Sequence, residues 1–255
     1  SAFDLDALVI QHAEDNELSK DGQVNDGIIA TKLGLQGIPD YAEKIIIERD
    51  LTLLEDFNCR YHIAQISSEK SVEIIKSRKE TVKFTTGVSI NNLSLNQNDI
   101  GDFRTFLKLS PPLRTEEDRL SLIKGINQNL IDVIVSDHKP EDEESKRLTF
   151  SQAATGASGI ETLLPLALEL FHNESIKLNK IVECLTCNPA KILKIDKGNL
   201  SVGSDADLCI VDIYKPWVVK KEKMISKSKN TCIEDKKLQG KVISTFINGV
   251  ELFKC

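Results

Sequence analysis

Short apolar runs alternate along this chain with longer stretches in which apolar residues recur at helical spacing. Ile131, Val133, Ile134 and Val135 form one such run, which ends abruptly in polar residues. Strands that are separated by helices of about 12 or more residues are typical of βα units, whose strands pair in parallel. The pattern therefore predicts an α/β fold built around a parallel sheet.

The expected elements follow one another over the first 196 residues. We expect strands over residues 6–13, 61–66, 82–89, 103–109 and 131–135. We expect helices over residues 40–57, 67–75, 115–126, 160–171, 176–185 and 188–193. Asp40 and Glu43 resemble a capping box at the start of the first helix. After Gly198 the residue pattern becomes typical of short strands separated by turns. We therefore expect a division into residues 1–196 and a small C-terminal β segment over residues 197–255.

Composition narrows the class of protein. The 255 residues are 40% hydrophobic and 28% charged, which is typical of a globular chain. The 33 Lys and Arg residues against 39 Asp and Glu residues give a net charge of −6, which argues against nucleic acid or an anionic membrane as the main partner. No apolar run reaches the roughly 18 to 20 residues of a membrane span, and the first ten residues (SAFDLDALVI) lack the basic region and cleavage site expected of a signal peptide. Together with scattered cysteines that we interpret as reduced, this predicts a cytoplasmic protein acting on a small molecule.

Candidate chemistry lies where apolar runs end. Ser136, Asp137 and His138 directly follow the run that ends at Val135, as when a buried strand delivers polar groups to the rim of a sheet. Gly156 and Gly159 follow and allow the backbone to approach a ligand closely. His12 ends another apolar run, although a core histidine is the commoner interpretation from periodicity alone.

Five motifs resemble those of the dihydroorotases, a family of cyclic amidohydrolases. Residues 137–141 (DHKPE) are similar to the family's Asp-His-Ala-Pro-His, and residues 156–162 (GASGIET) to its Gly-x-x-Gly-x-Glu-Thr segment. Three further motifs stand at residues 12–15 (HAED, fifth strand), 108–114 (KLSPPLR, seventh strand) and 226–230 with 240–242 (SKSKN and GKV, C-terminal signature). Each is weak alone, but their order is that of the family and they extend over nearly the whole chain.

The resemblance implies a TIM-type (β/α)8 metal-dependent hydrolase barrel, of which this chain supplies about strands 5 to 8, with the C-terminal segment part of a composite β-sandwich. It implies reversible hydrolysis of dihydroorotate to N-carbamoyl-aspartate in pyrimidine biosynthesis, with one or two zinc ions per complete protein. By the same resemblance Asp137 is the catalytic proton carrier and a metal ligand, and His12 is a metal ligand. The family's first-strand His-x-His pair would lie before Ser1, and no His-x-His occurs in the chain.

The sequence departs from the family at three positions. Gln65 stands where dihydroorotases usually place a second zinc-binding histidine, and an amide oxygen is a poorer zinc ligand than imidazole. Ser110 replaces an asparagine that helps to hold the substrate, and Glu141 replaces a histidine that contacts the substrate carboxylate. A carboxylate at residue 141 would repel that group. By resemblance the backbone near Gly156 would contact the edge of the pyrimidine.

Two alternatives stay open. Gln65 and Glu141 are compatible with a catalytically inactive dihydroorotase-like subunit that partners aspartate carbamoyltransferase. Ser110 and Glu141 also permit a related amidohydrolase acting on hydantoin or allantoin. A homo-oligomer or a complex with aspartate carbamoyltransferase is a possible assembly in either case. Half a barrel leaves edge strands unpaired, so we do not expect residues 1–255 to be stable alone.

Overall fold

A four-stranded parallel sheet forms the centre of the chain in a computed structural model, which describes residues 5–57 and 59–255. The strands lie in the order β1-β4-β5-β6, with β1 at Leu8–Gln11, β4 at Arg60–Ile66, β5 at Thr85–Ser89 and β6 at Val133–Val135. All three pairings are parallel. The predicted α/β class with a parallel sheet is confirmed, and β1 and β6 are its edge strands.

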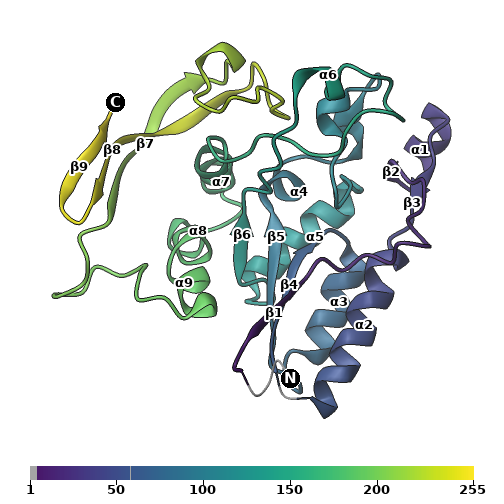
Figure 1. Cartoon of the computed structure of the whole chain (residues 1–255), viewed down its shortest axis with the longest axis horizontal. Helices are drawn as coiled ribbons and strands as arrows, with labels where there is room; N and C mark the ends of the chain where they lie inside the picture. Colours follow the sequence, from purple (N-terminus) through teal and green to yellow (C-terminus); the bar gives the residue numbers. More distant parts are fainter. Residues whose placement is uncertain (1–4, 58) are drawn as a thin grey trace.

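Helices connect and cover these strands (Figure 1). Those of the sheet region are α2 (Tyr41–Asp56), α3 (Glu69–Arg78), α4 (Ile90–Ser94), α5 (Glu116–Asn127), α6 (Glu143–Lys146), α7 (Leu163–His172), α8 (Leu178–Leu185) and α9 (Cys187–Leu193). The α3 helix contacts both α2 and α5, and α8 contacts β6. A small excursion between β1 and α2 holds β2 (Val24–Asn25), α1 (Ile28–Leu33) and β3 (Gly37–Ile38). Each predicted helix is present, with bounds shifted by a few residues.

Capping side chains are present at the starts of some helices and absent at others. Ser68 caps α3 by accepting a hydrogen bond from Ser71 N, and Thr115 with Asp118 forms a full capping box at α5. Asp40 makes no side-chain capping bond at α2, so the predicted capping box is wrong there. Glu43 is instead 3% exposed and accepts hydrogen bonds from the loop after β4, because it lies on the buried face of its helix.

The strand predicted over residues 103–109 is also wrong. Thr105–Leu107 forms a short 3-10 helix. Because β5 pairs directly with β6, the sheet offers no place for another strand between them. The apolar character of this segment is explained by Leu107, at the end of the 3-10 helix, and Leu109, just after it, which are each 2% exposed.

A second sheet is antiparallel and lies apart from the first (Figure 1). It comprises β7 (Leu208–Val218), β8 (Lys237–Ile247) and β9 (Val250–Lys254), in that order. It meets the rest of the chain where β8 contacts α7. Gly240 allows this contact, because a Cβ atom there would lie 2.3 Å from Leu168 Cδ1.

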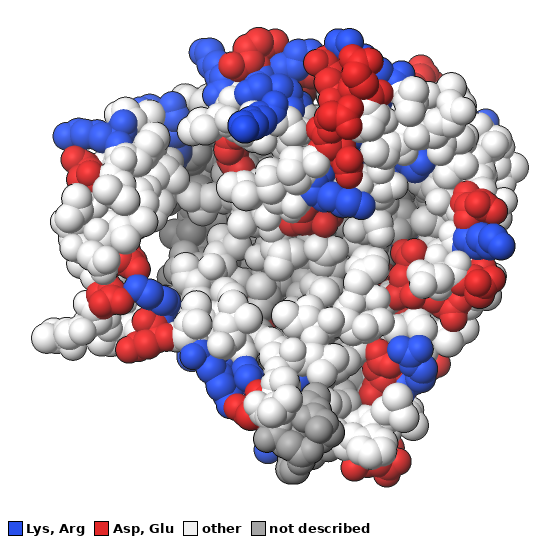
Figure 2. Space-filling view, in the orientation of Figure 1, with Lys and Arg blue, Asp and Glu red and all other residues white. Residues whose placement is uncertain are grey.

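The surface drawn in Figure 2 carries Lys and Arg side chains beside Asp and Glu side chains around its periphery, whereas its middle is largely uncharged. This face therefore has no extended patch of one sign. Within the ranges that the structure describes, no helix combines the length and the apolar character needed to cross a bilayer.

Candidate functional site

The carboxyl ends of the four parallel strands bring polar side chains to one edge of the sheet. His12 directly follows β1, and Gln65 is the penultimate residue of β4. Ser89 ends β5, and Asp137 comes two residues after β6. In parallel α/β enzymes this edge is where ligands bind. The four side chains therefore define the candidate site.

Asp137 is the most connected of these side chains. Its Oδ1 accepts a hydrogen bond from Gln65 Nε2 at 3.1 Å, and its Oδ2 accepts one from Ser89 Oγ at 3.3 Å. Burial raises the pKa of Asp137, and the hydrogen bonds from Gln65 and Ser89 and the charge of His12 only partly oppose this effect. The backbone of Asp137 is left-handed, with φ at +49°, a conformation that few non-glycine residues adopt and that is found often at functional sites.

His12 is the exposed residue among these four. Its Nε2 is 3.3 Å from Ser110 Oγ and 3.8 Å from Glu14 Oε2. The Glu14 carboxylate is the main cause of the raised pKa of His12, and Glu43 and Asp137 add to it. The structure thus brings Ser110 close to His12 and adds Glu14 as an acidic neighbour.

The donor set fits part of a zinc site. Imidazole and carboxylate, as on His12 and Asp137, are common zinc ligands, and a catalytic zinc usually has three protein ligands. Gln65 points an N–H, rather than its oxygen, at Asp137. Across residues 5–57 and 59–255, no three His, Cys, Asp or Glu side chains are grouped closely enough to hold a metal ion. The described residues therefore provide two good donors, and a complete site needs others.

Glu141 and Gly156 lie on two loops that the C-terminal signature joins. Asn230 Oδ1 accepts a hydrogen bond from Glu141 N at 3.3 Å, and Asn230 Nδ2 donates one to Gly156 O at 3.1 Å. Glu141 also lines a cavity of about 470 Å³ together with residues of the 226–230 segment. Sequence reasoning noticed this segment only as a family signature, and the structure shows what it contacts.

Gly156 has a steric reason to be glycine. Its φ is +136°, and a Cβ atom there would lie 2.7 Å from Lys139 O. Its N–H donates to Lys108 O at 2.9 Å, and its carbonyl accepts from Lys146 Nζ as well as from Asn230. The polar groups of Gly156 are thus engaged within the protein, and its predicted contact with a substrate stays a prediction.

A buried charged network behind the site was not found from the sequence. Arg114 is 3% exposed and donates from Nε to Ser67 Oγ at 2.7 Å, and Ser67 Oγ donates in turn to Glu43. Arg114 Nη1 also donates to Asn25 Oδ1 at 2.8 Å. Ser67 directly follows β4, so the network holds the end of the strand that carries Gln65. These residues are far apart in sequence, and only the 108–114 motif pointed to one of them.

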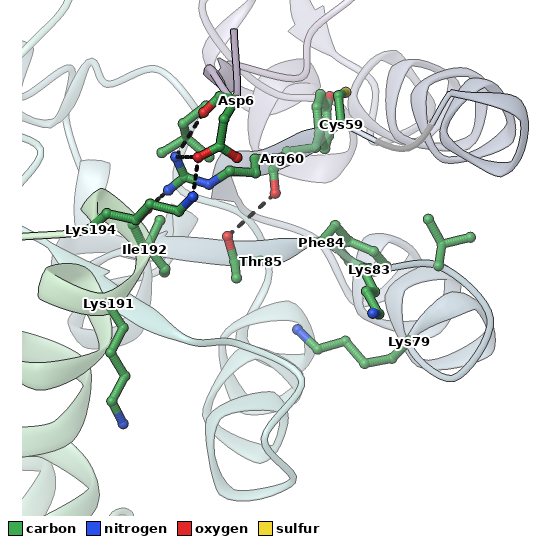
Figure 3. Close-up of a pocket in the computed structure, with 13 residues that line it drawn as sticks. Asp6, Cys59, Arg60, Lys79, Lys83, Phe84, Thr85, Lys191, Ile192 and Lys194 are labelled. Atoms are coloured by element: carbon green, nitrogen blue, oxygen red, sulfur yellow. Dashed lines mark hydrogen bonds and ion pairs between the residues drawn. The ribbon is translucent and has the colours of Figure 1, made fainter. Parts of the chain in front are cut away.

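A cavity of about 700 Å³ lies at the opposite, amino-terminal ends of the strands (Figure 3). Leu8, Arg60 and Thr85 line it near the starts of β1, β4 and β5, and several lysines surround it. Arg60 donates to Ile192 O, and Asp6 pairs with Lys194. Its lining includes neither His12 nor Asp137, so it is separate from the candidate site.

Comparison with known sequences gives consistent similarities. Residues 1–252 match the model of the amidohydrolase family. The chain is 42% identical over 247 residues to the dihydroorotase of Ehrlichia canis (strain Jake), covering 96% of this chain and 55% of that protein. It is 40% identical over 255 residues to the dihydroorotase of Anaplasma phagocytophilum (strain HZ), covering 99% of this chain and 57% of that protein. The chain therefore spans about half the length of the curated relatives that it matches.

Solved structures show the same fold. The L-hydantoinase (dihydropyrimidinase) from Arthrobacter aurescens superimposes with a TM-score of 0.85 at 26% identity, covering 99% of this chain and 58% of that one. The dihydropyrimidinase from Brevibacillus agri NCHU1002 gives a TM-score of 0.86 at 23% identity, covering 98% and 57%. The second likeness, at this low identity, concerns the fold alone.

Proposed function

The chain belongs to the amidohydrolase family, and from that premise we propose that it is part of a dihydroorotase, which reversibly hydrolyses dihydroorotate to N-carbamoyl-aspartate in pyrimidine biosynthesis. The relatives with 38–42% identity over nearly the whole chain carry that name, which supports this substrate over other cyclic amides. The observation that carries the proposal is the position of Asp137, which lies two residues after β6, is held by Gln65 and Ser89, and is close enough to His12 for the two charges to affect each other's pKa.

Asp137 is suited to carry a proton. Hydrolysis breaks the ring C–N bond, adds the hydroxyl of water to the carbonyl carbon and delivers a proton to the leaving nitrogen. A buried carboxylate with a raised pKa can take the proton from water and return it to nitrogen, since its pKa lies nearer to the working pH. Gln65 and Ser89 fix the orientation of the carboxylate through one hydrogen bond to each oxygen.

We propose zinc as the metal, held by His12 and Asp137 together with ligands beyond the described residues. When bound, zinc would polarise the amide carbonyl and make water a better nucleophile at neutral pH. Ser110 could help to hold the substrate by one hydrogen bond, given its place beside His12. Glu141 and Gly156 would frame the far side of the substrate from the two loops that Asn230 joins.

Several finer points belong to the same proposal. β1, β4, β5 and β6 would be strands 5 to 8 of a (β/α)8 barrel, and residues 197–255 would be part of a β-sandwich separate from residues 1–196. The likeness to a hydantoinase supports the barrel, and the separate antiparallel sheet of β7, β8 and β9 supports the division of the chain. A homo-oligomer or a complex with aspartate carbamoyltransferase, and a cytoplasmic location, remain predictions from the sequence.

The experiment is an assay of dihydroorotate hydrolysis and of zinc content in the longest natural form of the protein, after dialysis. Hydrolysis with one or two zinc ions per chain supports the proposal, and one ion would mean a mononuclear enzyme. A folded protein with no zinc and no turnover would contradict it.

The second candidate is an inactive subunit that supports aspartate carbamoyltransferase. One observation favours it: an amide N–H, rather than an imidazole nitrogen, faces Asp137. Co-purification with aspartate carbamoyltransferase, in the absence of turnover, would support this alternative.

A further inference from the structure

Two buried lysines hold the loop that follows α6, and neither is used by the proposed chemistry. Lys146 is 1% exposed and Lys108 is 7% exposed. Lys146 Nζ donates to Ala154 O at 2.8 Å and to Gly156 O at 3.0 Å. Lys108 Nζ donates to Phe150 O and to Ser151 O, both at 2.9 Å. Four backbone carbonyls of residues 150–156 thus bind two ammonium groups.

These charges have no direct counter-ion. Within residues 5–57 and 59–255, all four of these bonds go to neutral carbonyl oxygens, and burial is the largest influence on both amines. Burying an ammonium group without a paired carboxylate is costly. Burial lowers the pKa of Lys146 to about 8, so most of its population is still charged at neutral pH. Because no carboxylate in the described part of the chain neutralises these two charges, they create a positive electrostatic potential that can attract an anionic ligand.

Both lysines are linked to the candidate site by segments of a few residues. Lys108 is two residues before Ser110, which contacts His12. The loop held by Lys146 pairs with the segment after β6, where Ala157 forms a bridge with His138 and its carbonyl accepts from Lys139 N at 2.9 Å. The positive charges therefore lie behind the loop that packs directly on the residues after Asp137.

The lysines also bear on Glu141. This carboxylate stands where the family places a histidine that contacts the substrate carboxylate, and by itself it would repel an anion. The charge of Glu141 raises the pKa of Lys146, so the two groups are close enough to interact electrostatically. Because low-dielectric surroundings strengthen such interactions, two buried cations can outweigh one partly exposed anion.

We propose that Lys108 and Lys146 are specificity-determining residues, whose buried charges make the site prefer a cyclic amide that carries a carboxylate over a neutral one. The inference rests on the proposed function and deepens it, since it names a source of positive potential that would favour an anionic substrate. The lysines act through the potential and through the loop that they position, not by touching the reacting atoms.

The test compares an anionic with a neutral substrate in the longest natural form of the protein. The ratio of kcat/KM for dihydroorotate to kcat/KM for 5,6-dihydrouracil is measured in the wild type, Lys108→Met and Lys146→Met. We expect the ratio to fall about tenfold in each variant, because each loses one buried charge. Lys180→Met, whose lysine binds Asn129 on the surface, serves as the control and should keep the ratio.

A purely structural role gives a different result. If the lysines only hold the loop, both substrates lose activity in the same proportion, and an unchanged ratio overturns the proposal. Glu141→Gln provides a variant that leaves the buried lysines in place, and it should raise the ratio because one opposing charge is lost. A ratio that does not rise in Glu141→Gln also counts against the proposal.

A binding experiment distinguishes failure of this proposal from failure of the proposed function. If the wild type hydrolyses neither substrate, the dissociation constants of orotate and uracil are compared by calorimetry in the same variants. A loss of preference for orotate in Lys108→Met and Lys146→Met would support charge selection even in an inactive protein. Equal binding of orotate and uracil by the wild type would overturn it.

Discussion

Gln65 Nε2 donates a hydrogen bond to Asp137 Oδ1 over 3.1 Å, across the intervening strand β5. An amide therefore stands directly against the candidate catalytic carboxylate, where an imidazole would be able to share a metal with it. The bond also lowers the pKa of Asp137 against the effect of burial. Gln65 therefore influences the pKa and the orientation of Asp137, even though it is a poor zinc ligand.

Replacing Gln65 by histidine should raise zinc affinity, and turnover with it. Imidazole binds zinc more strongly than an amide oxygen does, so an added ligand should raise affinity about 10-fold to 100-fold. Zinc per chain after dialysis and the rate of dihydroorotate hydrolysis are the measurements. Gln128→His, at the exposed end of α5, is the matched control. No change in zinc content would remove residue 65 from the metal shell.

Asp137→Asn should reduce kcat about 10²-fold to 10⁴-fold, the usual contribution of a positioned general acid or base. Asparagine suits this test better than alanine, because it tolerates the left-handed backbone at φ +49°. Circular dichroism should show an unchanged fold. Full activity in this variant would contradict the assignment of Asp137 as the proton carrier.

Arg114→Met should destabilise the protein by about 1 to 3 kcal/mol, because it leaves the buried acceptors Ser67 Oγ and Asn25 Oδ1 without their N–H donor. The midpoint and slope of urea unfolding provide the free energy of unfolding. The double variant Arg114→Met with Glu43→Gln should lose less stability than the sum of the two single losses, because Ser67 Oγ links the two side chains. Additive losses in the two single variants would show that these side chains are not coupled.

The stability of the wild type should rise relative to Lys146→Met as the pH increases from 7 to 10. The folded pKa of Lys146 is about 8 and its ordinary value is 10.5, so between these values the unfolded chain binds a proton that the folded chain has released. By linkage, the free energy of unfolding then increases with pH. The gain is at most about 3 kcal/mol, and the nearby groups Cys232, Glu141, Lys108 and Lys139 modify it.

Urea unfolding of both proteins at several pH values measures this difference. The neutral amine keeps two N–H groups, which match the two carbonyl acceptors at Ala154 and Gly156. The loop should therefore stay closed at high pH. A difference in stability that does not change with pH would show that Lys146 is not buried as described.

The sequence by itself determined the order of elements and the positions of the candidate groups. Apolar runs and helical spacing act locally, so they predicted the parallel α/β class and the helices that Ser68 and Thr115 cap. The motifs placed His12 and Asp137 at strand ends for the same reason. These signals lie within a few residues of the groups that they predict.

Only the tertiary structure decided which groups meet. The contacts of Gln65 with Asp137 and of Arg114 with Ser67 join residues 72 and 47 positions apart. The direct pairing of β5 with β6 excluded the strand expected over residues 103–109. Burial decided the roles of Glu43, Lys108 and Lys146, since a charged side chain on a helix or loop gives no local sign of whether it faces water or the interior.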